Sequence, residues 1–220
     1  MILFDLDGTL VDTTDLILQS FVHTFDIHAP GRAPSREALI ATFGRSLPAT
    51  LREIAREEGA ADPEAWAADM LATYRAFQRE RHDVLIRPFD GVEDMLRALQ
   101  ADGHRLGVVT SKMEGSARRG LRLFGLEDYF EVGVFHDDTM SHKPDPAPLI
   151  LAAARAGVAP SEVTYVGDST HDIVAGRAAG MRTIAVLWGP FDRAVLEAEH
   201  PDHLIAHPSV LAAIVGRAQD

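Results

Sequence analysis

The alternation of short apolar runs with stretches of helical spacing is the feature that most constrains how this chain can fold. The apolar runs contain no charged residue, as expected for strands buried on both faces of a sheet, and they span residues 2–4, 106–109, 132–135, 163–166 and 183–187. Apolar residues recur with helical spacing over residues 92–99, 117–124, 146–156 and 173–179. Strands that alternate with helices predict an α/β protein built on a doubly wound, mainly parallel sheet.

A long interval interrupts this alternation. About a hundred residues separate the first apolar run from the second, and no stretch within them has the pattern of a strand. Several stretches do have helical spacing, for example residues 16–25 and 66–77. We therefore expect residues 14–86 to form an inserted all-α domain, and residues 1–13 and 87–220 to form the core that contains the sheet.

Composition limits the partners and the location that we expect. The 220 residues carry a formal net charge of -12, so the chain repels nucleic acid and anionic membranes, and neither is an expected partner. The absence of cysteine excludes disulfides and thiolate metal sites. No apolar run is long enough to span a bilayer, and the N-terminus lacks the basic region of a signal peptide. We expect a soluble cytoplasmic protein.

Polar residues that suit phosphate chemistry follow the predicted strands at their carboxyl ends or begin the helices after them. Ligand sites in open α/β sheets form beyond the carboxyl ends of the strands, so we expect these residues to meet at one site. They are, in chain order, Asp5, Asp7, Gly8, Thr110, Ser111, Lys143, Asp168 and Asp172.

Each of these motifs also has a purely structural explanation. Two acids before a glycine are typical of a solvated strand end or an Asx-turn, and a lone lysine is usually a solvated surface charge. Ser111 and Glu114 have the Ser-x-x-Glu spacing of a capping box. Asp168 or Ser169 is placed to cap the following helix. A capping role is compatible with phosphate binding, because a helix N-terminus attracts anions.

The order of the motifs resembles that of the haloacid dehalogenase superfamily of phosphotransferases: Asp-x-Asp, then Thr or Ser, then Lys, then an acidic pair. The resemblance covers essentially the whole chain and implies a Rossmann-like core with a helical cap. Asp5 suits the nucleophile, because a carboxylate needs no base to activate it. Asp7 suits general acid–base work, in which it protonates the leaving oxygen and then takes a proton from the attacking water.

The resemblance extends to the ligands of phosphate and metal. The phosphoryl group would be bound by Gly8, Thr110, Ser111 and Lys143, and Ser111 stands where relatives often carry Asn. Mg²⁺ is the expected cofactor, because it prefers hard oxygen ligands and keeps several waters. Its direct ligands would be Asp5, the main-chain carbonyl of Asp7, and Asp168. Asp172 would instead hold a metal-bound water or Lys143.

The helical region resembles caps that close over the active site in this superfamily. Residues 43–47 resemble a specificity loop in which Arg45 would grip a second anionic group of the substrate, although an exposed loop arginine would fit the same sequence. Residues 16–25 and 74–77, with His82, resemble the pyrophosphatase side of the branch that joins bacterial phosphoglycolate phosphatases and HAD-type pyrophosphatases. The implied substrate is a small doubly anionic phosphate compound, such as 2-phosphoglycolate or pyrophosphate. The chain is expected to be a monomer or a homodimer.

Other activities on this fold stay open. A β-phosphoglucomutase-like phosphomutase would use the same core, but related mutases often have Val after the motif glycine, where this chain has Thr9. A dehalogenase does not need the acid–base function of Asp7. A phospho-accepting signalling domain also uses an aspartate on a doubly wound sheet, but Asp7 and the long insert argue against a slowly decaying phosphate. A catalytically dead binding module is disfavoured because no expected motif residue is missing.

Overall fold

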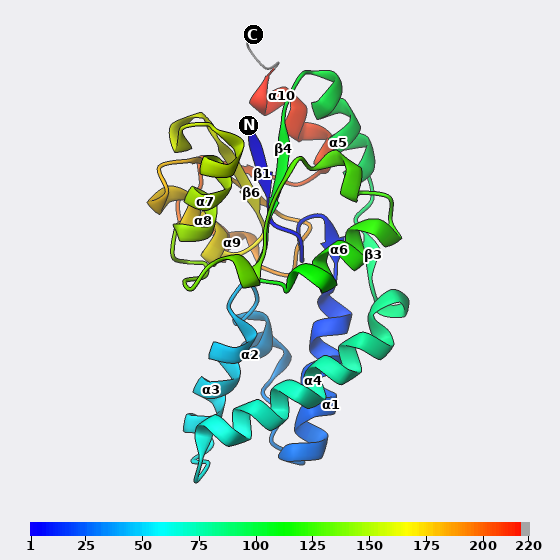
Figure 1. The fold of residues 1–220 in the computed structure, drawn as a ribbon, viewed down its shortest axis with the longest axis vertical. Helices are drawn as coiled ribbons and strands as arrows, with labels where there is room; N and C mark the ends of the chain where they lie inside the picture. The colour runs from blue at the N-terminus through cyan, green and yellow to red at the C-terminus, as the bar shows by residue number, and fades with distance from the viewer. Residues whose placement is uncertain (217–220) are drawn as a thin grey trace.

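The structure, a computed structural model, describes residues 1–216, which form two parts stacked along the long axis of the molecule (Figure 1). The upper part contains a six-stranded sheet with the order β5-β4-β1-β6-β7-β8, in which neighbouring strands are parallel. Its strands are β1 (Ile2–Phe4), β4 (Leu106–Val109), β5 (Val132–Val134), β6 (Thr164–Gly167), β7 (Arg182–Val186) and β8 (His203–Ile205). The predicted α/β class and doubly wound sheet are confirmed.

Helices cover both faces of this sheet, because side chains along each strand point alternately to one face and the other. Ile2 and Phe4 of β1 belong to one apolar cluster, and Leu3 belongs to another. The first cluster includes residues of α5 (Val92–Ala101), α6 (Glu114–Leu123) and α10 (Leu211–Val215), and the second includes residues of α7 (Ala147–Ala156) and α8 (Thr170–Ala178). Helix α9 (Arg193–Glu197) and short 3₁₀ turns complete this part, the turns at Glu127–Tyr129, His136–Asp138, Pro160–Glu162 and Pro208–Val210.

Short strands lie outside the alternation that the sequence predicts. β8 extends the sheet at its edge, where His203 and Leu204 are only partly buried, so the segment lacks the apolar run of a central strand. β2 (Val11–Asp12) and β3 (Arg87–Pro88) form a separate antiparallel pair. The prediction of no strand between the first two apolar runs is therefore wrong, because strands as short as β2 and β3 carry no readable periodicity.

Helices make up the lower part of the molecule (Figure 1). They are α1 (Thr14–His28), α2 (Arg36–Ile40), α3 (Leu47–Glu57) and α4 (Pro63–Leu85). Their apolar faces meet in a cluster of their own, which includes the fully buried Phe25, Leu51 and Met70. The domain boundaries at residues 14 and 86 stay a prediction. None of the helices within residues 1–216 combines the length and the apolar composition that crossing a bilayer requires.

The chain reverses its direction of winding beside β1, which lies between β4 and β6. After β1 the chain forms the helical part and then adds β4 and β5 on one side of the sheet. It then returns to add β6, β7 and β8 on the other side. The carboxyl ends of β1, β4 and β6 point toward the helical part (Figure 1), which is where a ligand site is expected in such a sheet.

Candidate active site

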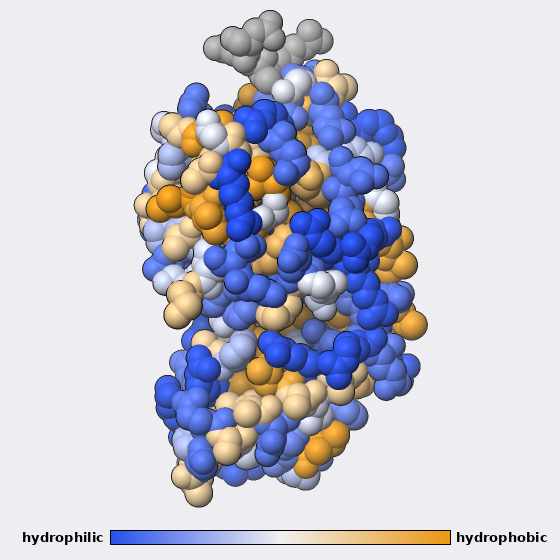
Figure 2. Space-filling view, in the orientation of Figure 1, coloured by the Kyte–Doolittle hydropathy of each residue, from blue (hydrophilic) through white to orange (hydrophobic). Residues whose placement is uncertain are grey.

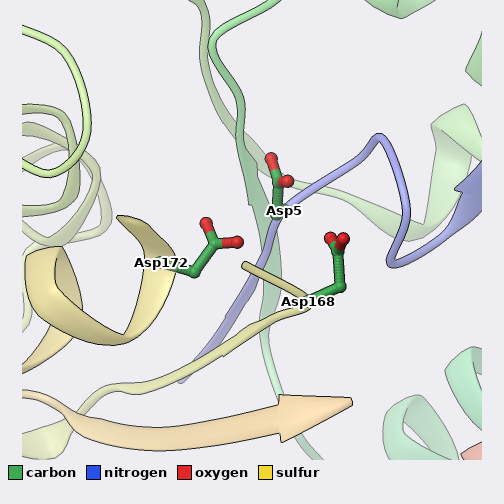
Figure 3. A group of neighbouring side chains, drawn as sticks. All are labelled: Asp5, Asp168 and Asp172. Atoms are coloured by element: carbon green, nitrogen blue, oxygen red, sulfur yellow. The ribbon is translucent and has the colours of Figure 1, made fainter. Parts of the chain in front are cut away.

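Carboxylates from separate segments converge beyond the ends of β1 and β6 (Figure 3). Asp5 follows β1, Asp168 follows β6, and Asp172 lies in the first turn of α8. All three residues are buried, and one oxygen of each lies within 4.8 Å of the others. The structure thus brings the first and last motifs of the sequence into one cluster.

The ammonium group of Lys143 lies among these carboxylates. Its Nζ is 2.8 Å from Asp5 Oδ1 and 2.6 Å from Asp172 Oδ1, and it donates a hydrogen bond of 3.1 Å to the Tyr165 hydroxyl. The side chain is only 2% exposed, so salt and water screen these interactions little. Lys143 is therefore the positive centre of a buried network and not a solvated surface charge.

Hydrogen bonds engage both oxygens of Asp172. Oδ1 accepts from Lys143 Nζ at 2.6 Å and from the Tyr165 hydroxyl at 3.0 Å. Oδ2 accepts from the Ser169 amide at 3.0 Å and from its hydroxyl at 2.6 Å. Ser169 is also the N-cap of α8 and forms a reciprocal capping box with Asp172. Asp172 is therefore suited to orient Lys143, because few of its lone pairs are left for another ligand.

Burial and an excess of negative charge decide how this network titrates. Burial raises the pKa of Asp5 to about 7, although the neighbouring Lys143 opposes the rise. Burial also raises the pKa of Asp168 well above its ordinary value, and the charge of Asp172 adds to the rise. Burial alone would raise the pKa of Asp172, but Lys143 and the Ser169 hydrogen bonds bring it below its ordinary value. One ammonium among three carboxylates leaves negative charge that a bound cation would neutralise.

The donor set around Asp168 suits a divalent cation such as Mg²⁺. Carboxylate oxygens are the hard ligands that Mg²⁺ prefers, and Asp5 and Asp168 supply them. The Thr9 hydroxyl donates a hydrogen bond of 2.9 Å to Asp168 Oδ1 and so fixes this carboxylate. Gly8, at a φ of +85°, and Gly189 pass so close to Asp168 that a side chain at either position would collide with it. The residues present therefore fit a small oxygen-bound cation.

Asp7 lies at the edge of this network and has a cation of its own. Lys112 Nζ is 2.7 Å from Asp7 Oδ1, and the two side chains are 11% and 24% exposed. Lys112 and Lys143 are the only two lysines in the chain, and each pairs with an aspartate of the first motif. We did not identify Lys112 from the sequence, although its position directly after Thr110 and Ser111 is a usable signal.

Thr110 and Ser111 differ in their surroundings. Thr110 is buried at the end of β4, and its hydroxyl accepts a hydrogen bond of 3.2 Å from the Lys112 amide. The Ser111 hydroxyl donates a hydrogen bond of 2.8 Å to the Gly44 carbonyl in the helical part. The predicted capping box is wrong, because α6 begins only at Glu114 and has no side-chain cap. Ser111 therefore links the core to the loop before α3.

A cavity of about 320 Å³ lies between the sheet and the helical part. Asp5, Asp7 and Thr110 line it from the core. Arg45 lines it from the loop before α3, where it forms an ion pair with Glu53, and its contact with substrate stays a prediction. Figure 2 shows a hollow between the two parts with hydrophilic residues along its rim. The lining also includes Arg75, from the segment 74–77 that resembles pyrophosphatases, and Gln78, Arg79 and His136, to which the sequence assigned no role.

Comparisons with known proteins identify relatives of the whole chain. Residues 2–186 match the family described as haloacid dehalogenase-like hydrolase. The chain is 42% identical over 215 residues to pyrophosphatase PpaX of Bacillus pumilus, a match that covers 98% of this chain and 95% of the relative. It is 37% identical over 215 residues to pyrophosphatase PpaX of Halalkalibacterium halodurans, which covers 98% of this chain and 96% of the relative.

Solved structures share the fold over almost the whole chain. One is described as a predicted phosphoglycolate phosphatase from Haemophilus somnus 129PT, with a TM-score of 0.86, 23% identity and coverage of 98% of this chain and 97% of that one. Another is a hydrolase from Pseudomonas syringae, with a TM-score of 0.84, 24% identity and 97% coverage of both chains. The likeness extends through the helical part, since it covers nearly all residues.

Proposed function

The chain belongs to the haloacid dehalogenase-like hydrolase family, and on this basis we propose that it is a Mg²⁺-dependent phosphohydrolase that acts through a phosphorylated Asp5. Inorganic pyrophosphate is the proposed substrate, supported by the full-length likeness to proteins named pyrophosphatase. A 2-phosphoglycolate-like phosphomonoester is the alternative within the same class of small anionic phosphates. The Asp5 carboxylate carries the proposal, because Lys143 holds one of its oxygens at 2.8 Å and the residue lines the cavity.

In the first step, the Asp5 oxygen that Lys143 does not hold attacks phosphorus. The new bond to phosphorus forms as the bond to the leaving oxygen breaks, and the leaving group keeps the electron pair of the broken bond. Asp7 donates a proton to that leaving oxygen. The Thr110 hydroxyl and the Lys143 ammonium bind the phosphoryl oxygens, where they stabilise the charge of the transition state. Gly8 and Ser111 are further proposed contacts of the phosphoryl group.

In the second step, water attacks the phosphorus of phospho-Asp5. The ionised Asp7 accepts a proton from this water while the bond between the Asp5 oxygen and phosphorus breaks. Phosphate leaves, and the nucleophile and the acid–base group return to their starting states. Pyrophosphate would thus be converted to two phosphate ions by one aspartate pair.

Asp5, Asp168 and the main-chain carbonyl of Asp7 are the proposed ligands of Mg²⁺. When bound, the cation neutralises charge on the carboxylates and on the phosphoryl group. The burial that raises the pKa values of Asp5 and Asp168 supports this assignment, because carboxylates in such surroundings gain most from an adjacent cation. The proposed role of Asp172 is to hold Lys143 in place.

Residues 14–86 are the proposed cap, and residues 1–13 and 87–220 are the proposed core. The β2–β3 pair lies where the chain enters and leaves the helical part. The hydrogen bond of 2.8 Å from Ser111 to Gly44 holds the loop before α3 against the core. A cap in this position excludes bulk water from the phosphoryl group during transfer.

Phosphate release by the Asp5→Asn variant tests the proposal. The wild type is expected to release phosphate from pyrophosphate only with Mg²⁺, and the variant is expected to lose turnover because an amide oxygen is a poor nucleophile. Asp15→Asn is the matched control, since Asp15 is exposed at the start of α1. Acid-quenched wild-type protein should carry one phosphoryl group by intact mass, and the Asp5→Asn protein none. Wild-type activity in a folded Asp5→Asn protein would show that Asp5 is not the nucleophile.

A further inference from the structure

Two arginines of the cavity wall have no ion-pair partner within residues 1–216. Arg75 and Arg79 both line the cavity that Asp5 also lines. They lie one helical turn apart on α4, so their side chains project from the same face of the helix. The chain has 33 acidic residues against 21 lysines and arginines, so arginines without an ion pair are unexpected on composition alone.

Other cations around the cavity are already paired. Arg45 is bound to Glu53, and Lys112 Nζ lies 2.7 Å from Asp7 Oδ1. The neighbouring arginine on α4, Arg81, lies over the Phe77 ring, 6.0 Å from its centroid, and is outside the cavity lining. Arg75 and Arg79 therefore supply positive charge to the cavity that no side chain of the described residues neutralises by an ion pair.

His136 lines the same cavity, and one of its buried ring nitrogens has no hydrogen-bond partner among the described residues. Nδ1 of His136 is inaccessible to solvent and unpaired among the described residues. The ring is fixed by stacking on His142, with centroids 4.1 Å apart, and the His136 amide donates to the Lys112 carbonyl at 3.0 Å. A buried polar atom without a partner is destabilising, so this ring marks an unsatisfied polar group in the wall of the cavity.

We propose that Arg75 and Arg79 bind the leaving phosphate of pyrophosphate while the transferred phosphate lies against Asp5 and Thr110. This assignment rests on the proposed function and names the residues that select the substrate. Guanidinium groups suit the task because they bind phosphate oxygens through two parallel hydrogen bonds. Lys112, which is paired with Asp7, and His136 line the cavity from the core.

The subsite distinguishes substrates by the charge of their leaving group. When the bond to the transferred phosphorus breaks, the leaving phosphate gains negative charge, so cations beside it stabilise the transition state. A phosphomonoester whose leaving group carries no second phosphate or carboxylate, such as p-nitrophenyl phosphate, gives Arg75 and Arg79 nothing equivalent to bind. The arginines therefore favour pyrophosphate over such esters without taking part in the attack on phosphorus.

A comparison of two substrates on one double variant tests this assignment. The Arg75→Ala/Arg79→Ala variant should lose on the order of 10-fold to 100-fold in kcat/KM for pyrophosphate, the size expected when hydrogen bonds to charged groups are removed. Its kcat/KM for p-nitrophenyl phosphate should stay within about 3-fold of wild type, which also shows that the variant is folded. Arg81→Ala, the same substitution on the same helix, should leave both values unchanged. Inhibition of p-nitrophenyl phosphate hydrolysis by imidodiphosphate should weaken in the double variant as pyrophosphate turnover does.

The outcomes separate this assignment from the proposed function. An equal loss on both substrates, or no loss on either, would overturn the role of the arginines while leaving Asp5 as nucleophile. A wild-type protein that releases no phosphate from either substrate with Mg²⁺ would instead overturn the proposed function itself. A selective loss on pyrophosphate, with the imidodiphosphate effect, would support the subsite.

Discussion

The buried network around Lys143 and the arginine face of α4 border the same cavity but differ in physical character. In the network, Asp5, Lys143 and Asp172 are buried and joined by contacts of 2.6–2.8 Å. On the helix face, Arg79 is exposed, Arg75 is half-buried, and neither has an ion pair within residues 1–216. In the network, Lys143 is ion-paired with two of its carboxylates, whereas the two arginines have no ion-pair partner among the described residues.

This difference indicates how the work of the site is divided. Groups held rigidly in a low-dielectric environment need no reorganisation when charge develops, which suits the chemical step. Cations on a partly exposed helix are more adaptable and more strongly screened, which suits recognition of the remote end of a substrate. We infer that the core performs phosphoryl transfer and that α4 selects the compound from which the phosphoryl group is transferred.

The Lys143→Met variant removes the cation of the buried network and should have the largest effect. Removing the ammonium leaves Asp5 and Asp172 buried without their cation, and breaking a buried ion pair destabilises a protein by roughly 3–5 kcal/mol. Activity should fall by at least roughly 10²-fold, because the charged group that we propose to bind the phosphoryl oxygens is lost. Urea denaturation and steady-state phosphate release measure the two effects.

An exposed counterpart provides the control for Lys143. Arg97 also bridges two carboxylates, at 2.7 Å from Glu93 and 2.8 Å from Asp94, but on the surface of α5. Arg97→Met should therefore change stability far less than Lys143→Met and leave activity intact, because solvent screens exposed ion pairs. Equal destabilisation by the two variants would contradict the distinction between a buried network and surface pairs.

The pH dependence of Mg²⁺ binding tests the buried carboxylates, and we expect an effect of intermediate size. Burial raises the pKa of Asp5 to about 7, and a cation binds the ionised carboxylate, so binding must release the proton below that pH. The apparent Mg²⁺ affinity should rise by up to about tenfold per pH unit below about pH 7 and level off above it. The increase in Tm caused by Mg²⁺, measured at about pH 5.5 and about pH 8, reports this.

For the metal-free protein, we expect folding stability to fall as the pH rises. A carboxyl whose pKa is raised by folding keeps its proton in the folded state between about pH 4, the unfolded value, and about pH 7. The metal-free protein should therefore lose this stabilisation as the pH rises through that window. Asp5→Asn should remove this component of the pH dependence, and an Mg²⁺ effect on Tm that weakens as the pH rises would contradict the assignment.

The Arg45→Ala variant should have the smallest effect and tests the α4 side of the comparison. Glu53 already neutralises Arg45, so its removal should change kcat/KM for pyrophosphate by no more than about 3-fold, well below the effect of removing Arg75 and Arg79. Glu53→Gln frees the Arg45 guanidinium and should raise kcat/KM slightly. A loss for Arg45→Ala as large as that for the double variant would make the loop before α3, and not α4, the main contact with the leaving group.

Local sequence signals predicted the strand-borne residues more fully than those of the cavity wall, where they indicated Arg45 but not Arg79 or His136. Asp5, Thr110 and Asp168 follow apolar runs, and parallel strands bring their carboxyl ends together, so their convergence was predictable. Only the capping role of Ser111 was wrong, because the Ser-x-x-Glu spacing does not reveal that α6 begins later and that the Ser111 hydroxyl donates to the Gly44 carbonyl. The edge strand β8 has too little apolar pattern to be recognised.

By itself, the sequence determined the layered α/β core, the helical interval and the set of groups that meet at the sheet edge. Periodicity, and the polar residues that directly follow each apolar run, are local properties of the chain. Only the tertiary structure decided which charges are paired. Lys112 forms an ion pair with Asp7, and Arg45 forms one with Glu53. Arg75 has no ion pair among the described residues. No short sequence pattern relates the residues that form these pairs. The strength of each pair depends on burial and on the distance between the charges, and both are set only when the chain folds.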